Sequence, residues 1–156
     1  MLGELPKRYF LTSGWGEAST ELNAFDAALI KAGIGDTNLV KMSSILPPGA
    51  EQVANFKFPK GALVPLAFGT MASSRPGTLI STAVAVGIPE DPGSAGLIME
   101  CEHLGLPEEC EQLARSMVRE GMEIIRGVRI REIKSISASL TVRKVGAVFA
   151  AVVLCP

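Results

Sequence analysis

The sequence predicts a single α+β domain, a mixed-sheet layered sandwich of the αββα type. Its 156 residues and 16.4 kDa correspond to one ordinary domain, and no repeat or linker divides them. Roughly six to eight strand-like segments accompany only two main helical segments. The helices do not alternate regularly with the strands, which disfavours a doubly wound parallel sheet and favours stacked layers of sheet and helix.

The N-terminal region predicts a strand followed by a capped helix. Residues 8–13 have the character of a strand, which we expect to end at residues 14–16, Gly-Trp-Gly. Ser19 or Thr20 can accept a hydrogen bond from a backbone amide in the first turn of the next helix. Gly33 suits the position just after a helix C-terminus, where positive φ is common. The helix therefore fills the interval between these residues.

This first helix is amphipathic and leads into a second strand. Leu22, Phe25 and Leu29 recur at helical spacing and form one apolar face. After a glycine-rich turn, residues 37–46 form a strand. Residues 47–48 are both proline, and they end the strand because proline lacks the amide hydrogen that a sheet needs.

The rest of the chain predicts five more strands and one more helix. The strands are expected at residues 62–70, 78–87, 95–101, 128–140 and 144–154. Pro107 suits the first turn of the second helix, and Glu108 and Glu109 favour that turn electrostatically. An apolar stripe continues this helix to about Arg126.

Composition excludes some classes of protein and predicts an oligomer. The 15 basic and 16 acidic residues give a net charge of −1, which argues against a protein that binds nucleic-acid phosphates. Apolar residues make up 47% of a chain with limited interior, so we expect the surplus at the interfaces of a homo-oligomer. The apolar run from Val145 to Cys155 is too short to cross a membrane, and the N-terminus does not resemble a signal peptide. We therefore expect a cytoplasmic protein with no membrane partner.

Cysteine and histidine are too few for several common sites. The sequence has three cysteines, Cys101, Cys110 and Cys155, and one histidine, His103. It contains no CxxC pair, no GxSxG elbow and no phosphate-binding glycine loop. We therefore expect no metal site, and a nucleophilic hydrolase would have to use His103 as its base.

One segment combines groups that can react with each other. The strand at residues 37–46 runs into Ser43 and Ser44 and then into two prolines. The prolines make the backbone rigid beside a hydroxyl that could attack the carbonyl preceding it. From these residues alone, an ordinary polar strand end is the simpler interpretation.

Four segments share their sequence with one family. Residues 22–50, LNAFDAALIKAGIGDTNLVKMSSILPPGA, resemble the signature region of pyruvoyl-dependent arginine decarboxylase. GALVPLAFG at residues 61–69, LIMECE at residues 97–102 and GAVFAAVVL from Gly146 onward resemble the same family in the same order. The resemblance spans most of the chain. Met42 departs from it, because a β-branched residue is expected before the serine pair.

The resemblance implies that the chain is a zymogen that cuts itself. Ser44 Oγ attacks the carbonyl carbon of Ser43, and the resulting ester breaks by β-elimination, which leaves a carboxylate on Ser43 and dehydroalanine at residue 44. Hydrolysis with loss of ammonia then yields an N-terminal pyruvoyl group, the expected covalent cofactor. The expected products are chains 1–43 and 44–156. Asn38 is implied to polarise the Ser43 carbonyl during processing.

The resemblance also implies that Glu100 is the proton donor. A Schiff base between the substrate amine and the pyruvoyl carbonyl delocalises the charge left by carbon dioxide, and an acid must then protonate the carbon. Glu100 lies in an otherwise apolar predicted strand, where burial is expected to raise its pKa. Glu102 shares its face by period-two alternation and is the alternative donor. From the residues alone, an edge-strand charge facing solvent is an equally good interpretation of Glu100.

The resemblance implies that Asp26 binds the substrate guanidinium. A carboxylate can bind a guanidinium through two parallel charge-assisted hydrogen bonds. The spacing of Asp26 from Leu22 and Leu29 predicts that it lies on the inward face of the helix, where an unpaired acid is costly. Leu29 is the expected apolar wall for the substrate's methylene chain. The alternative is an Asp26 side chain that faces solvent.

The predicted activity is therefore that of a pyruvoyl-dependent carboxy-lyase that converts L-arginine to agmatine and carbon dioxide, in polyamine biosynthesis or acid resistance. The resemblance implies a homotrimer of processed chains with active sites at subunit boundaries. Two alternatives are decarboxylation of histidine or aspartate, and a non-cleaving oligomeric binding protein of the same fold. An acid at Asp26 favours a cationic substrate, and so favours arginine over aspartate.

Overall fold

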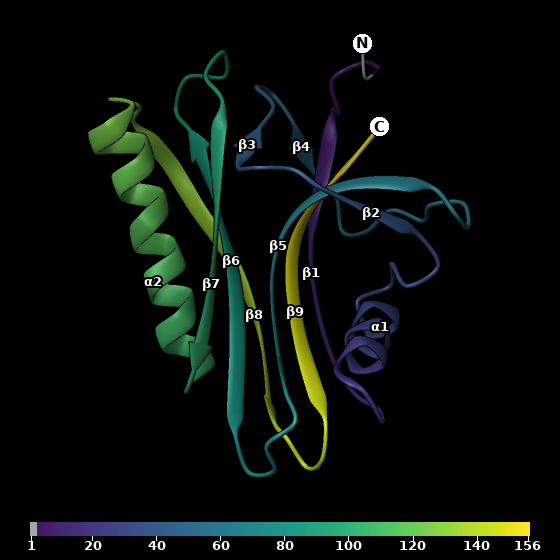
Figure 1. Ribbon diagram of the computed structural model, residues 1–156. Helices are drawn as coiled ribbons and strands as arrows, with labels where there is room; N and C mark the ends of the chain where they lie inside the picture. The colour runs from purple at the N-terminus through teal and green to yellow at the C-terminus, as the bar shows by residue number, and fades with distance from the viewer. Residues whose placement is uncertain (1–2) are drawn as a thin grey trace.

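The computed structural model describes residues 3–156, which form one α+β domain as predicted (Figure 1). The elements in chain order are β1 (Arg8–Glu17), α1 (Glu21–Lys31), β2 (Asn38–Lys41), β3 (Ile45–Leu46), β4 (Glu51–Gln52), β5 (Leu63–Ser73), β6 (Leu79–Pro89), β7 (Gly96–Leu104), α2 (Pro107–Arg119), β8 (Ile130–Thr141) and β9 (Gly146–Cys155). A π-helical segment, Glu120–Ile125, continues α2.

The strands of the described residues belong to two sheets of different kinds. The first sheet has the order β2-β5-β9-β1-β4, with β2 parallel to β5, β1 parallel to β4, and β9 antiparallel to both of its neighbours. The second sheet has the order β3-β7-β6-β8 and is antiparallel throughout. The prediction of a mixed sheet is therefore correct for the first sheet and wrong for the second.

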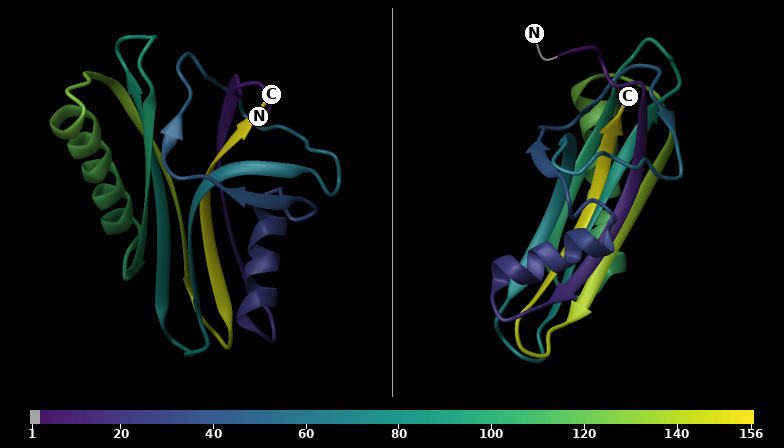
Figure 2. Two further views of the ribbon diagram at one scale, coloured as in Figure 1. Left: turned by 45° about the horizontal axis from the view of Figure 1, so that its top comes forward. Right: turned by 90° about the vertical axis from the view of Figure 1, so that its right-hand side faces the viewer.

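The two sheets face each other, and one helix covers the outer face of each (Figure 1). α1 packs against β1 and β9, and α2 packs against β6, β7 and β8. Between the sheets, Val84, Val86 and Ile98 belong to one buried cluster with Ala150 and Val152, which removes apolar surface of both sheets from water. The start of β1 and the end of β9 lie together at one end of the sandwich (Figure 2). The same end carries β3 and β4.

β1 is longer than the sequence predicts because its glycines serve packing. The strand runs through Gly14 and Gly16 and pairs with β9 along its whole length. A Cβ atom on Gly14 would lie 2.2 Å from the carbonyl oxygen of Ala28, and one on Gly16 would lie 2.5 Å from the Cβ of Ala27. The missing side chains let the α1 backbone approach the sheet closely. The prediction that the strand ends at these glycines is wrong.

The ends of the helices follow local sequence signals. Thr20 caps α1 by accepting a hydrogen bond from the Asn23 amide at 3.1 Å, and Gly33 follows the helix with a φ of 83°. α2 begins at Pro107 as predicted and keeps α-helical geometry to Arg119. The remainder of the predicted second helix is π-helical. No helix within residues 3–156 has the length and apolar character needed to cross a bilayer.

The predicted strand at residues 37–46 is two strands in different sheets. β2 is the edge strand of the first sheet and pairs with β5, whereas β3 is the edge strand of the second sheet and pairs with β7. The chain therefore passes from one sheet to the other within a few residues, at Met42 to Ser44. This crossing is visible as the short link between β2 and β3 in Figure 1.

Candidate active site

The Ser43–Ser44 peptide bond lies in the crossing between the sheets. On its N-terminal side, the Met42 amide donates a hydrogen bond to the Leu66 carbonyl at 2.9 Å, which extends the pairing of β2 with β5. On its C-terminal side, the Ser44 carbonyl accepts a hydrogen bond from the Ile98 amide at 2.7 Å, which extends the pairing of β3 with β7. Ser43 is exposed and Ser44 is half-buried. Each side of this bond is thus anchored in a different sheet.

This anchoring has a direct consequence for a chain cut between Ser43 and Ser44. The new C-terminus would remain attached to the first sheet through β2, and the new N-terminus would remain attached to the second sheet through β3. β1 and α1 lie in the fragment before the cut; β1 pairs with β9, and both elements share a buried cluster with Phe149 and Val153 of the other fragment. The two fragments would therefore stay together without a covalent link.

Strand register brings Glu100 close to residue 44. The pairing of β3 with β7, carried one residue further, puts Ser44 opposite Ile98. Glu100 lies two residues beyond Ile98 and on the same face, so it is the diagonal neighbour of Ser44, at a typical separation of about 7–8 Å. Glu102 lies two residues further away, and its carboxylate accepts a hydrogen bond from the Thr70 amide at 3.3 Å. The geometry therefore favours Glu100 over Glu102 as the acid beside residue 44.

The surroundings of Glu100 suit a group that holds a proton. Burial raises the pKa of the Glu100 carboxyl, and the nearby Lys41 ammonium group opposes this rise. Lys41 Nζ lies 3.8 Å from Glu100 Oε1 and 4.6 Å from the centre of the Phe68 ring. Lys41 was missed by the sequence reasoning, since its contact with Glu100 arises from the juxtaposition of β2 and β7 and leaves no local pattern.

Asn38 lies at the start of β2, away from the serine pair. Its Nδ2 donates a hydrogen bond to the Gly61 carbonyl at 2.9 Å, and its backbone amide donates to the Ala62 carbonyl at 2.8 Å. The strand between Asn38 and the crossing is about 10 Å long. The structure therefore does not bring the Asn38 amide to the Ser43 carbonyl within one chain.

α1 holds Asp26 and Leu29 in opposite environments. Asp26 is exposed, so the prediction that it lies on the inward face is wrong. Ala24 and Ala28 make the close contacts with the sheet, because their small side chains match the glycines of β1. Leu29 is only 7% exposed and belongs to the buried core cluster beneath the helix.

The structure does not bring Asp26 to Ser44 and Glu100 within one chain. α1 lies on the outer face of the first sheet (Figure 1), whereas Glu100 faces the first sheet, since a Cβ atom on Gly69 of β5 would lie 3.4 Å from the Glu100 Cβ. The first sheet therefore lies between the Asp26 helix and the Glu100 side chain. A site that uses all three residues needs more than one copy of the chain.

The remaining reactive side chains take part in local structure. His103 Nε2 lies 2.8 Å from Glu109 Oε2. The three cysteines are free and buried. In the described part of the chain, no three His, Cys, Asp or Glu side chains form a group that could hold a metal ion.

Comparison with known proteins identifies the family of the chain. The model of the pyruvoyl-dependent arginine decarboxylase family matches residues 8–156. The chain belongs to this family. Among its relatives, the pyruvoyl-dependent arginine decarboxylase of Methanocaldococcus jannaschii is 47% identical over 97% of this chain and 91% of the relative. Those of Methanococcus maripaludis and Pyrococcus abyssi are 44% and 42% identical, over 97% of this chain and 92% and 96% of the relative.

Proposed function

We propose that this chain is a self-processing, pyruvoyl-dependent decarboxylase that converts L-arginine to agmatine and carbon dioxide. Family membership over nearly the full chain supports the activity, because the relatives carry that name. One observation of this structure carries the proposal further: Ser44 and the half-buried Glu100 are diagonal neighbours across β3 and β7. The reactive residue and a proton donor are thereby in one place.

Processing cuts the chain between Ser43 and Ser44. The Ser44 hydroxyl adds to the Ser43 carbonyl carbon, the acyl group moves from nitrogen to oxygen, and elimination across the Cα–Cβ bond of residue 44 releases the Ser43 carboxylate. The residue then loses ammonia on hydrolysis and becomes a pyruvoyl group. The crossing supports this step, since strands hold both neighbours of the bond while the bond itself belongs to neither sheet. Asn38 assists only if the segment rearranges or another copy supplies the residue.

The residues around position 44 fit a pyruvoyl group. Its C-terminal carbonyl is held by the Ile98 amide, and its side-chain direction is the face that carries Glu100. The ketone supplies an electron sink for the loss of carbon dioxide from the substrate. Glu100 donates its proton to the substrate α-carbon, and burial favours the protonated form that this role requires. Lys41 fixes the position of the Glu100 carboxyl through their 3.8 Å contact.

The substrate site is completed by a neighbouring copy in a homotrimer. Asp26 is exposed on α1, so its carboxylate is free to bind the guanidinium of a substrate held at another copy's residue 44. Leu29 packs in the buried cluster between α1 and the first sheet and so stabilises the position of this helix. An apolar cavity of about 930 Å³ lies beside β3 and includes Leu5, Ile45 and Leu63, all exposed in the single chain. Such a surface fits a subunit boundary. We expect the assembled enzyme in the cytoplasm.

A direct assay tests the function. Purified protein is supplied separately with arginine, histidine and aspartate, and both carbon dioxide and the amine product are measured. We expect agmatine from arginine and no turnover of the other two. Turnover of histidine or aspartate instead would change the substrate, and no turnover of any amino acid by fully cleaved protein would overturn the enzyme assignment.

A further inference from the structure

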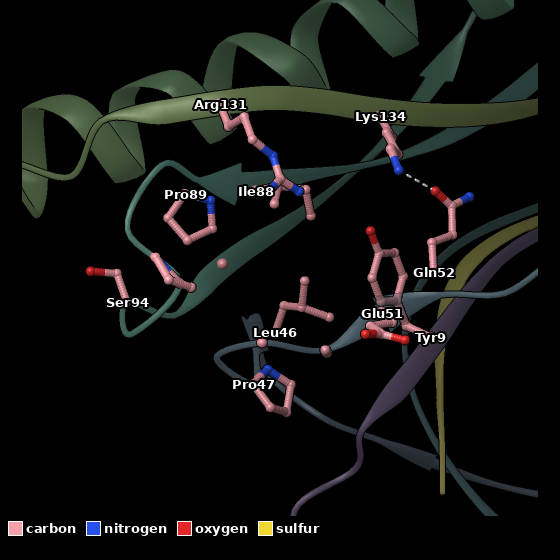
Figure 3. A pocket seen from close by; sticks show the side chains of 14 residues that line it. Tyr9, Leu46, Pro47, Glu51, Gln52, Ile88, Pro89, Ser94, Arg131 and Lys134 are labelled. Carbon is pink, nitrogen blue, oxygen red and sulfur yellow. Dashed lines mark hydrogen bonds between the residues drawn. The ribbon is translucent and has the colours of Figure 1, made fainter.

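A second cavity lies at the same end of the sandwich, between β8 and the segment that links β3 to β4 (Figure 3). Its volume is about 390 Å³, and β1, β4, β8 and the β6–β7 hairpin contribute to its wall. Ser44, Glu100 and Asp26 do not line it. The cavity is therefore separate from the groups assigned to decarboxylation.

Tyr9 presents an unused hydroxyl to this cavity. The residue is only 2% exposed, and its ring packs among the apolar side chains between the sheets. The hydroxyl points into the cavity (Figure 3), and within residues 3–156 it has no hydrogen-bond partner. Burial raises the pKa of this hydroxyl, so it remains protonated and able to donate at neutral pH. No fully buried side-chain polar atom of the described residues lacks a partner, so the Tyr9 oxygen is reachable from the cavity, and a ligand or water there can accept its hydrogen bond.

Two cations extend from β8 toward the same space. Arg131 and Lys134 line the cavity on the side that the Tyr9 hydroxyl faces (Figure 3). Lys134 Nζ donates a hydrogen bond to Gln52 Oε1, which fixes the ammonium group across the cavity mouth. The cations, the amide and the hydroxyl together offer several donors to one acceptor group.

Acidic residues limit the net charge that the cavity can accept. Glu132 Oε1 lies 3.6 Å from Arg131 Nη2 and 3.6 Å from Lys134 Nζ, so it neutralises part of both cations. Glu51, on β4, lines the wall across from β8. A phosphate dianion would be repelled by Glu51 in the lining and by Glu132 beside the two cations, whereas a molecule with one carboxylate and one ammonium group matches the two walls.

We propose that this cavity binds a small amino acid in its zwitterionic form. The Tyr9 hydroxyl, Arg131 and Lys134 bind its carboxylate, and Glu51 binds its ammonium group. Carboxylate binding by charged donors is among the stronger polar interactions, and the Tyr9 hydroxyl adds a direct hydrogen bond. The proposal is independent of the decarboxylase assignment, because it uses none of the same residues.

The experiment uses the processed wild-type protein, with L-alanine and propionate as matched probes in isothermal titration calorimetry. The two probes share a carbon skeleton and a carboxylate and differ by the amino group. We expect L-alanine to bind and propionate to bind at least about fivefold more weakly, because it leaves Glu51 without a partner. Tyr9→Phe and Arg131→Met should each weaken L-alanine binding by about tenfold or more. Arg75→Met, at an exposed turn, is the control and should bind like wild type.

Several outcomes would overturn the proposal. Wild-type protein that fails to bind L-alanine removes the site. L-alanine affinity that is unchanged in both Tyr9→Phe and Arg131→Met locates the ligand elsewhere, including at the residue 44 ketone. Equal affinity for propionate and L-alanine removes the role of Glu51 and the amino-acid assignment. Arginine decarboxylation by Tyr9→Phe should equal that of wild type, so a failure of the cavity proposal and a failure of the decarboxylase assignment are distinguishable.

Discussion

The crossing between the two sheets and the outer helix α1 carry the residues assigned to catalysis, and they are organised in opposite ways. At the crossing, Ser44 and Glu100 are diagonal neighbours that backbone hydrogen bonds hold in register. On α1, Asp26 faces solvent and Leu29 is buried in the core. One chain therefore brings the proposed reactive serine and the proposed proton donor together, but the acid proposed to bind the guanidinium is directed outward.

The largest expected effect is at the crossing. Ser44→Ala should abolish both cleavage and decarboxylation, because no hydroxyl remains to attack the preceding carbonyl. Denaturing mass spectrometry should show one intact chain, and no agmatine should form. Ser43→Ala is the matched control: it removes the neighbouring hydroxyl but keeps the attacked carbonyl, so it should still cut. A Ser44→Ala protein that yields two fragments would disprove the assignment of the nucleophile.

Glu100→Gln should separate processing from turnover. The variant should be cut normally, while kcat for arginine should fall by about 10²–10⁴-fold because the proton donor is lost. Glu102→Gln, on the same face but further from residue 44, should retain kcat to within about fivefold. Reversed behaviour of these two variants would transfer the donor role to Glu102.

Asp26→Ala should lower kcat/KM for arginine on the order of 10²-fold while leaving cleavage intact, because it removes a charge-assisted contact with the guanidinium. The main change should be in KM. Unimpaired arginine turnover would remove Asp26 from the substrate site.

Co-assembly of two inactive variants tests whether Asp26 and Glu100 of one site come from different copies of the chain. If Asp26 and Glu100 of one site come from different copies, then co-assembled Asp26→Ala and Glu100→Gln chains should regain activity, up to about a quarter of wild type for random mixing. Steady-state assays before and after co-refolding provide the measurement. No regain, with hybrid assembly verified by native mass spectrometry, would mean that one chain supplies both residues.

Substitutions of Leu29 and Leu22 test which face of α1 is buried. Leu29→Ala should lower the free energy of unfolding by about 2–5 kcal/mol, because it opens a cavity in a buried cluster. Leu22→Ala, the same substitution at an exposed position of the same helix, should change it by less than about 0.5 kcal/mol. Urea denaturation of the processed proteins measures both. A similar loss in the two variants would contradict the assigned burial.

The smallest expected effect concerns the pH dependence of turnover. Burial raises the pKa of Glu100 and the Lys41 cation lowers it, so Lys41→Met should raise the pKa further. The donor must be protonated, and activity therefore declines as pH rises through this pKa. In Lys41→Met, the decline in kcat should move to higher pH, measured from pH 5 to 9. A shift to lower pH would show that Lys41 does not act on Glu100 through its charge.

Local signals in the sequence predict the helix ends and most strands, but not the packing between elements. Thr20 caps through its side chain, and Gly33 and Pro107 act through their backbone geometry, so all three roles can be predicted from the local sequence. Gly14 and Gly16 have their positions because a helix approaches from elsewhere, and the same residues equally suit a turn. The pairing of β1 with β9, which is distant in sequence, determines that these glycines lie within a strand and not in a turn.

In the candidate site, too, features with a local sequence signal are predictable and features set by packing are not. The position of Glu100 in an apolar strand left burial and solvent exposure equally open, and in the structure it is half-buried, which raises its pKa. Asp26 is wrongly predicted as inward-facing because the large apolar residues suggested the wrong face, while alanines make the close contacts. The Lys41 contact depends on two strands of different sheets and has no signal in the local sequence.

The intact mass of freshly purified wild-type protein under denaturing conditions shows whether the chain is cut and residue 44 becomes a pyruvoyl group. We expect two species that correspond to residues 1–43 and 44–156, the second with a ketone at its N-terminus that reacts with a carbonyl reagent such as a hydrazine. A single species with the mass of the uncut chain, unreactive toward that reagent, would contradict it.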